Sequence, residues 1–261
     1  MLNVSTRGNV LVGDDVLIGG FIITGKEPKK IVVRGSGPST NMIGALADPV
    51  LDLYQPAGTV ITNDDWQQAS NAADIPPSLQ PKDPRESAIL ITLQPGLYTG
   101  VVHGKTGAIG IGLVEVYDLT GGNSSKVANI STRGFAQTGD KRLIGGLIVG
   151  GGSYATTEVV VRAIGPSLSE ANVANPLPDP FLDVRDGNGN PIATNDNWKE
   201  DPNAGKVSQF GLAPKNDLES ALYLVVGPGA YTAIVSGNGG TSGVGLVEVY
   251  SATNESEVRT K

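Results

Sequence analysis

The chain has 261 residues, of which 39% are hydrophobic, and it contains no cysteine. Two domains of ordinary size fit in this length, and the absence of cysteine excludes disulfides, thiol catalysis and zinc–thiolate sites. Acidic residues outnumber basic ones 26 to 19, and no basic patch stands out, so we expect no nucleic-acid partner. The single histidine, His103, excludes a histidine triad or zinc cage repeated along the chain.

The predicted elements occur twice, in the same order, in the two halves of the chain. Short segments with alternating polarity or β-branched residues, bounded by turn residues, are typical of strands. In the first half they are residues 2–6, 17–23, 31–34, 50–54, 60–61, 88–93, 98–102 and 112–117. In the second half they are residues 129–134, 143–149, 159–162, 181–184, 192–193, 221–226, 231–235 and 245–250. No stretch shows a sustained helical period, so we predict an all-β chain.

This pattern indicates an internal duplication of one module. Roughly eight short strands in each half favour an antiparallel β-sandwich of the jelly-roll type. We therefore predict tandem sandwich domains over residues 1–119 and 128–253, a flexible polar linker over residues 120–127 and a polar tail over residues 254–261. Paired glycines inside residues 17–23 and 143–149 indicate a bulge or a close approach of two backbones.

Each half also carries the same acidic motif. It reads Asn63-Asp64-Asp65-Trp66, then Glu86-Ser87 and Pro95-Gly96-Leu97-Tyr98-Thr99 in the first half. This run resembles the bacterial pre-peptidase C-terminal domain, and the opening residues 5–21 resemble a repeat of large bacterial surface proteins. The first resemblance covers about the last two thirds of each half. It implies a secreted, non-catalytic β-sandwich module that sometimes binds calcium.

The acidic motif offers oxygen ligands of the kind that calcium prefers. The candidate ligands are Asp64, Asp65 and Glu86 in the first half and Asp196, Asn197 and Glu219 in the second. The alternative is that the Asp and Asn side chains hydrogen-bond their own turn, while Glu86 caps a strand or pairs with an arginine. A weaker candidate, residues 186–190, is better interpreted as a hairpin turn.

Trp66 and Trp198 follow the acidic residues directly and are candidate platforms for a sugar ring. The alternative, which we favour, is that each indole packs over the end of a sandwich. Four arginines lie at the ends of predicted strands or before glycines: Arg7, Arg34, Arg133 and Arg162. Anion recognition is one interpretation, but a structural role as partly buried partners of carboxylates is the better one.

No nucleophile elbow, phosphate loop or metalloprotease motif is present, so we do not expect an enzyme. The prediction is a structural or interaction protein of a bacterial cell surface or extracellular assembly, self-associating as a fibre subunit through its terminal strands. A carbohydrate-binding module that uses the Trp66 and Trp198 loops is the alternative. No apolar run of membrane-spanning length and no signal peptide occur in the chain, so we expect no membrane insertion.

Overall fold

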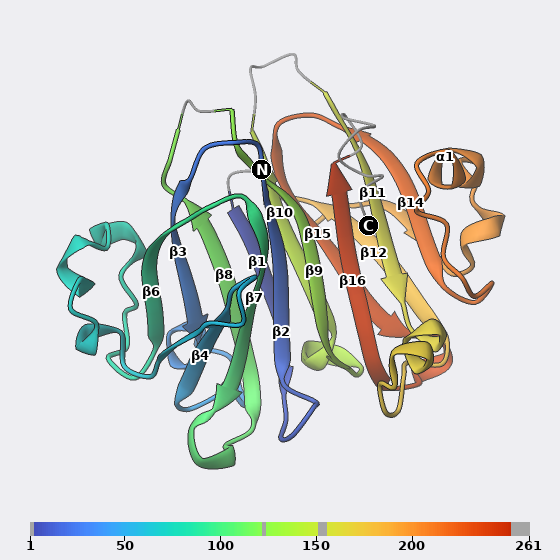
Figure 1. Ribbon diagram of the computed structural model, residues 1–261. Helices are drawn as coiled ribbons and strands as arrows, with labels where there is room; N and C mark the ends of the chain where they lie inside the picture. Colours follow the sequence, from blue (N-terminus) through green and yellow to red (C-terminus); the bar gives the residue numbers. More distant parts are fainter. Residues whose placement is uncertain (1–2, 122–123, 151–155, 252–261) are drawn as a thin grey trace. The chain divides into compact units, whose positions relative to one another are not determined.

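A computed structural model describes residues 3–121, 124–150 and 156–251 of the chain (Figure 1). The described residues form an antiparallel all-β protein, as the sequence predicted. Contacts divide the chain into two compact units, residues 2–128 and 129–261, which we call the N-terminal unit and the C-terminal unit. None of the helices among the described residues has the length and the apolar character needed to cross a membrane.

The N-terminal unit contains two series of hydrogen-bonded strands. Its strands are β1 (Asn3–Val10), β2 (Leu17–Thr24), β3 (Lys29–Ser36), β4 (Pro49–Tyr54), β5 (Val60–Asn63), β6 (Ser87–Leu93), β7 (Gly96–Gly104) and β8 (Gly110–Asp118). One series runs β6-β3-β8-β1, and the other runs β5-β4-β7-β2, with every pair antiparallel. Figure 1 shows β6, β3 and β8 side by side.

The C-terminal unit repeats this connectivity. Its strands are β9 (Lys126–Ala136), β10 (Leu143–Val149), β11 (Thr157–Ile164), β12 (Pro180–Asp186), β13 (Pro191–Asn195), β14 (Ser220–Val226), β15 (Gly229–Gly237) and β16 (Gly243–Ser251). One series runs β14-β11-β16-β9 and the other runs β13-β12-β15-β10. Strand β9 begins at Lys126, so the last two residues of the predicted linker belong to a strand.

The core of the N-terminal unit lies between its two series of strands. In β2 every second side chain is buried, which is the pattern of a strand with one face in a core. Phe21 of β2 stacks on Tyr98 of β7 with ring centroids 5.4 Å apart. A Cβ on Gly19 would lie 2.7 Å from Cγ1 of Val114 on β8. The glycine pair therefore marks a close approach to the other series, and β2 pairs with β7 without a shift in register.

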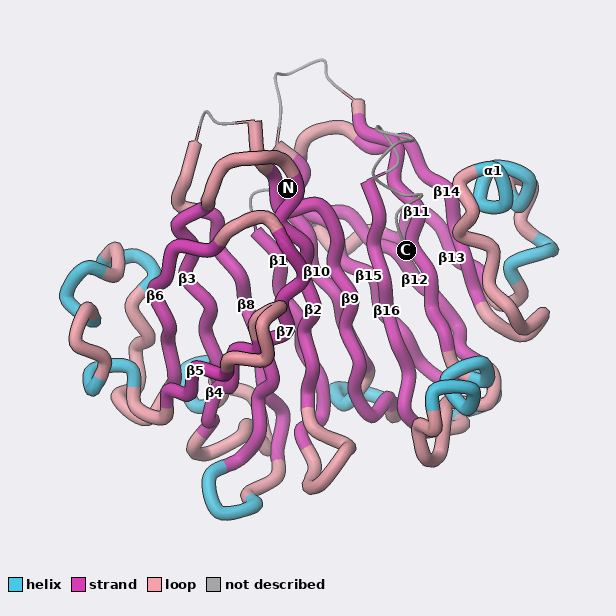
Figure 2. The backbone as a smooth tube through the Cα atoms, in the orientation of Figure 1, coloured by secondary structure: helices cyan, strands magenta, loops and turns pink. Residues whose placement is uncertain are grey.

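The long segment after each tryptophan is a covering layer built from short turns. In the N-terminal unit it forms 3-10 turns at Trp66–Gln68, Ala72–Asp74 and Pro77–Leu79. In the C-terminal unit it forms helix α1 (Ala204–Gln209), which Figure 2 shows beside β14. This helix was not expected, because its six residues are too short to show a helical period.

Two other expectations need correction. The stretch predicted as a flexible linker includes Ser125, which is 2% exposed and accepts a hydrogen bond from the Glu27 N–H at 2.9 Å. The terminal strands were expected to be open edges, but β16 lies between β11 and β9. Strand β1 pairs with β8 and stands at the end of its series in the N-terminal unit. The predicted polar tail, residues 254–261, lies outside the described residues.

Candidate functional site

Glu86 and Glu219, predicted as metal ligands, contact the Gly-Pro-Ser corners in this structure. The Glu86 side chain is 1% exposed, and its Oε1 accepts hydrogen bonds from the N–H groups of Gly37 (2.8 Å) and Ser39 (2.9 Å). Glu219 accepts the equivalent bonds from Gly165 (3.1 Å) and Ser167 (2.9 Å). A serine hydroxyl donates a further hydrogen bond to each carboxylate. Each glutamate therefore holds the Gly-Pro-Ser corner of its own unit, and these donors satisfy its buried charge.

The asparagine that opens each motif ties the acidic turn to the neighbouring strand. Asn63 Oδ1 accepts a hydrogen bond from the Ala88 N–H at 2.8 Å, and its Nδ2 donates to the Asp65 carbonyl at 3.2 Å. Asn195 makes the same pair of bonds, to Ala221 and Asn197, at 2.9 and 3.0 Å. These bonds fix where the following carboxylates lie.

Asp64 and Asp65 come together with a third carboxylate that the sequence analysis did not include. One carboxylate oxygen each of Asp48, Asp64 and Asp65 lies within 4.8 Å of the others, a spacing that a metal ion could bridge. Asp48 arrives from the loop before β4, so only the fold shows that it belongs to the group. The signal available in the sequence was the Asp-Pro pair at residues 48–49, which recurs at residues 179–180.

In the N-terminal unit a lysine compensates part of the charge of this group. Lys105 Nζ lies 2.6 Å from Asp64 Oδ2 and 3.7 Å from Asp48 Oδ2. The contact with Asp64 raises the pKa of the Lys105 ammonium. Oδ1 of Asp48 and Oδ1 of Asp64 are buried and have no hydrogen-bond partner among the residues that the structure describes. Three carboxylates suit a divalent cation, but the ammonium group occupies the place where its charge would be needed.

The C-terminal unit repeats two of these carboxylates, Asp179 and Asp196, with Asn197 in place of Asp65 and without the lysine. Asn238 stands at the position of Lys105, and its Nδ2 lies 3.2 Å from Asp179 Oδ2 and 3.0 Å from Asp196 Oδ2. Burial raises the pKa of the Asp196 carboxyl, and the charges of Asp179 and Glu200 raise it further. Asn197, the third predicted ligand, donates to Glu200 Oε1 at 3.1 Å. Asp179 and Asp196 are therefore bridged by an amide rather than by an ammonium group.

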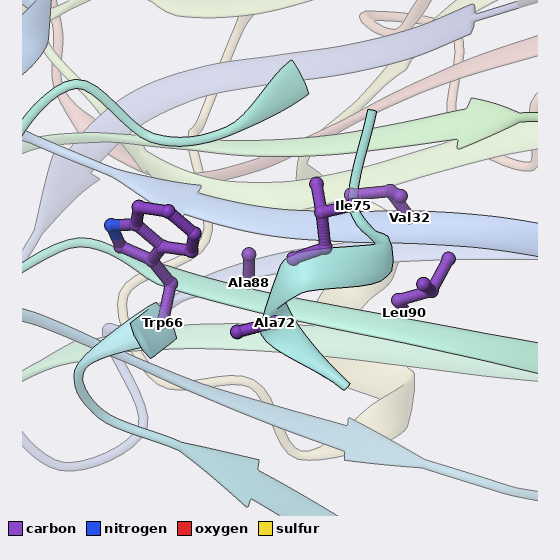
Figure 3. Close-up of a cluster of buried hydrophobic side chains, with 6 residues drawn as sticks. All are labelled: Val32, Trp66, Ala72, Ile75, Ala88 and Leu90. Atoms are coloured by element: carbon purple, nitrogen blue, oxygen red, sulfur yellow. The ribbon is translucent and has the colours of Figure 1, made fainter. Parts of the chain in front are cut away.

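The tryptophans do not form exposed platforms. Trp66 is 9% exposed and belongs to a cluster that is completed by Val32, Ala72, Ile75, Ala88 and Leu90 (Figure 3). Trp198 is half-buried and packs on the equivalent cluster around Val207. The packing alternative describes Trp66, because this residue is buried within the cluster. The Nε1 atoms of both indoles are buried, and no hydrogen-bond partner for them occurs in the described part of the chain.

Arg34 and Arg162 have structural roles in the two units. Arg34 Nε and Nη2 lie 3.1 and 2.5 Å from Glu115 Oε2, and Nη1 donates to the Leu79 carbonyl at 3.1 Å. Arg162 binds Glu248 and the Leu212 carbonyl in the same way. Each arginine thus ties the covering segment to the sheet beneath it.

Arg7 and Arg133 are half-buried on β1 and β9, in register with Leu113 and Leu246. Arg7 Nη1 lies 3.8 Å from the Met42 sulfur. His103 Nε2 lies 3.3 Å from Asp52 Oδ2 on the neighbouring strand. Among the residues that the structure describes, Asp48, Asp64 and Asp65 form the one group with the spacing of metal ligands.

Comparison with known proteins identifies no family for this chain. No protein-family model matches it, and no curated protein matches it. The solved structures that it resembles include a DUF4785 family protein from Legionella pneumophila, with 7% identity, a TM-score of 0.26, and coverage of 95% of this chain and 84% of that one.

Two further matches concern Sulfolobus Turreted Icosahedral Virus. The STIV MCP is 11% identical with a TM-score of 0.23, and the match covers 98% of this chain and 94% of that one. A chain of the atomic structure of the virus is 8% identical with a TM-score of 0.24, covering 94% and 85%. At TM-scores this low the matches indicate neither a fold nor a function.

Proposed function

We propose that this chain is a non-catalytic structural or interaction protein of a bacterial cell surface or extracellular assembly, and that it self-associates. In this proposal it consists of two tandem β-sandwich modules that arose by duplication. The same strand connectivity and the same buried contacts, such as Glu86 with Ser39 and Glu219 with Ser167, support the duplication. The resemblance of the acidic motif to the pre-peptidase C-terminal domain agrees with a secreted accessory module.

The observation that carries the proposal is a set of three exposed aliphatic side chains at one end of the N-terminal unit. Val12, Ile43 and Ile109 are 59%, 96% and 61% exposed. They lie at one end of the unit, since Gly44 and Ala45 pair with Ile111, and a Cβ on Gly107 would lie 3.8 Å from Val12 Cγ1. We call Val12, Ile43 and Ile109 the apolar end. Exposed aliphatic groups of this kind mark surfaces that bind other proteins.

The corresponding positions of the C-terminal unit are not apolar in this way. Aligning Gly13 with Gly139, Leu46 with Leu177 and Ile111 with Val244 places Thr138, Ala174 and Ser242 opposite the three residues of the apolar end. All three are exposed. The fold itself therefore does not require large aliphatic side chains there, which supports a binding role for them in the N-terminal unit.

The polar side chains support a non-catalytic role for a different reason. Glu86, Arg34 and Glu115 are held in contacts that fasten loops to sheets. A general acid or nucleophile needs a group that is free to reach a substrate. The carbohydrate alternative loses its basis in the N-terminal unit, because the Trp66 ring is covered by the chain itself.

Light scattering of the purified chain over a wide range of concentration tests the proposal. We expect the average mass to rise with concentration, because burial of the apolar end removes aliphatic surface from water. A mass that stays at that of one chain at every concentration contradicts self-association.

A further inference from the structure

A groove opens along one side of the N-terminal unit, between the edges of its two series of strands. Its volume is about 510 Å³, which lies within the range of ligand sites. The lining residues come from β5, from the turns after Trp66 and from β6. They are Ile61, Thr62, Asn63, Asp64, Gln68, Ala69, Ser70, Asn71, Ala88, Ile89, Leu90 and Ile91.

Both strands that border the groove lie at the ends of their series. Strand β6 pairs with β3, and β5 pairs with β4; within the described residues neither has a second partner strand. Such strands present main-chain N–H and C=O groups that another extended chain can pair with. In the register of β6, Ile89 and Ile91 stand opposite Val33 and Ile31 of β3.

Two side-chain contacts show which main-chain groups of β6 point into the groove. The Ala88 N–H donates to Asn63, and the Leu90 carbonyl accepts from Asn71 Nδ2 at 2.9 Å. A residue of an antiparallel strand directs its N–H and its C=O to the same side. Ala88 and Leu90 therefore face away from β3, and so does Thr92. Among the described residues, no partner is found for the N–H groups of Leu90 and Thr92.

The lining of the groove combines an aliphatic wall with acceptors and amides. Ile61, Ile89 and Ile91 supply the wall, and Gln68 and Asn71 supply amides. Asp64 is the one charged residue among those that line it, and Asp64 Oδ1 is buried without a hydrogen-bond donor. A ligand with N–H donors and an aliphatic side chain complements these groups, whereas an acidic ligand does not.

We propose that this groove binds an extended peptide segment of a partner protein, uncharged or basic and with aliphatic residues, which adds to β6 as a further strand. The peptide main chain pairs with the N–H of Leu90 and with both groups of Thr92, and one aliphatic side chain packs on Ile61 and Ile89. Strand addition draws its affinity from the main chain and its specificity from alternate side chains. This proposal rests on the interaction role proposed above and names the class of partner.

An extended peptide fits the groove better than a glycan does. Sugar sites use an aromatic face, and no aromatic side chain is among the lining residues. The groove also follows a strand edge over Ala88 to Ile91, and a strand rises about 3.3 Å per residue. The edge therefore offers a row of regularly spaced main-chain partners, which only another main chain can match along its length.

The test uses the full chain and short linear peptides selected on it from a random phage-displayed library. Titration calorimetry then measures the selected peptide with wild type and with the T92P and V225P variants. Thr92→Pro removes an N–H that does not bond β3, so the sheet tolerates it. Val225 is the equivalent residue of β14, 56% exposed, and is the matched control. We expect about a tenfold loss of affinity for T92P and none for V225P.

A second probe isolates the main chain. A copy of the peptide that is N-methylated at alternate residues keeps every side chain but loses the donors that face β6, so it should not bind. A library that yields no binder, a peptide that binds T92P or the N-methylated form unchanged, or a glycan array that is positive while peptides fail overturns the proposal. Self-association is measured without peptide, so its failure is distinguishable from failure of the groove.

Discussion

Glu86 and Glu219 are the buried charges on which each Gly-Pro-Ser corner depends. Removing the carboxylate leaves two N–H groups without acceptors, at a cost of about 1–3 kcal/mol for each orphaned buried group. We expect Glu86→Ala and Glu219→Ala each to lower the free energy of unfolding by about 3 kcal/mol. Urea unfolding measures the change, with Asp74→Ala, at an exposed turn position, as the control. An effect no larger than that of the control contradicts the structural role.

The carboxyl of Asp196 should make stability depend on pH in the opposite sense from a salt-bridged acid. Its pKa is raised in the folded protein above 3.8, chiefly by burial. The folded state then binds the proton more tightly than the unfolded state, so stability falls as the pH rises through the raised pKa. We expect Asp196→Asn to stabilise the protein at pH 7 by a few tenths of a kcal/mol, a small gain because solvent screens a half-buried group.

Melting curves between pH 3 and pH 7 check this expectation, and the gain from Asp196→Asn should vanish as the pH falls below the raised pKa. The matched variant is Asp64→Asn. Its carboxylate holds Lys105 at 2.6 Å, so this change should destabilise the protein at neutral pH instead. Equal effects of the two variants would show that Lys105 and Asn238 do not distinguish the two acidic groups.

Lys105 also decides whether calcium affects the N-terminal unit. With the ammonium in place, we expect neither calcium nor a chelator to move the melting temperature of this unit. In Lys105→Ala the three carboxylates repel one another, so we expect a lower melting temperature that calcium restores, because a ligand bound only by the folded state stabilises it. Calorimetry with calcium or chelator measures this. A wild-type protein whose melting temperature falls when the chelator is added would show that Asp48, Asp64 and Asp65 bind calcium.

A local pattern in the sequence locates some of the side chains of the candidate site. The repeated acidic turn pointed to Asp64 and Asp196, and a structural role for Arg34 and Arg162 follows from their places at the ends of apolar strands. The contacts of Glu86 with Gly37 and Ser39 were not predicted, since these partners lie more than forty positions away in the chain. Asp48 and Lys105 were missed because loops distant in sequence bring them to Asp64, and only the strand pairing determines which loops meet.

At the scale of elements, the corner at residues 37–40 depends on a glycine. A Cβ on Gly37 would lie 2.1 Å from the Leu46 carbonyl oxygen, far inside van der Waals contact. We expect Gly37→Ala to lower the free energy of unfolding by about 3 kcal/mol or more, because backbone must move. Gly205 of helix α1 has nothing within 4 Å of the added Cβ, so Gly205→Ala should stabilise by about 0.5–1 kcal/mol. Urea unfolding of both variants distinguishes these opposite effects.

The strands were the most predictable elements. The alternating polarity of β4 and β12 and the apolar, β-branched runs of β3 and β6 are visible in the sequence, and these strands lie where those patterns placed them. The covering segment was not predictable in the same way. Its turns form because Trp66, Ala72 and Ile75 need a surface to pack on, and that surface is the outer face of β3 and β6. The surface exists only after the strands have paired.

At the scale of the whole molecule, the all-β class followed from the sequence but the open edges did not. The strands near the two termini, β1 and β16, were expected to be open edges. Strand β16 instead has a partner on each side, β11 and β9, while β1 pairs with β8 at the end of its series. The open side of the N-terminal unit is formed by β5 and β6, from the middle of that unit. Sequence position does not reveal an edge, because long-range pairing decides which strand is last.

The apolar end offers a swap that separates association from folding. Replacing Val12, Ile43 and Ile109 with the residues at the matched positions of the C-terminal unit yields the variant V12T/I43A/I109S. These side chains are largely exposed, so their loss should change the melting temperature little. If the apolar end drives self-association, the variant should keep the mass of one chain at concentrations where the wild type is larger, since the aliphatic surface to be buried is gone.

Light scattering of both proteins at matched concentrations measures this, and circular dichroism confirms that the variant is folded. A folded variant that associates like the wild type would show that the contact lies outside the apolar end. The strand edges at β6 and β14 would then be the next candidate surfaces for self-association.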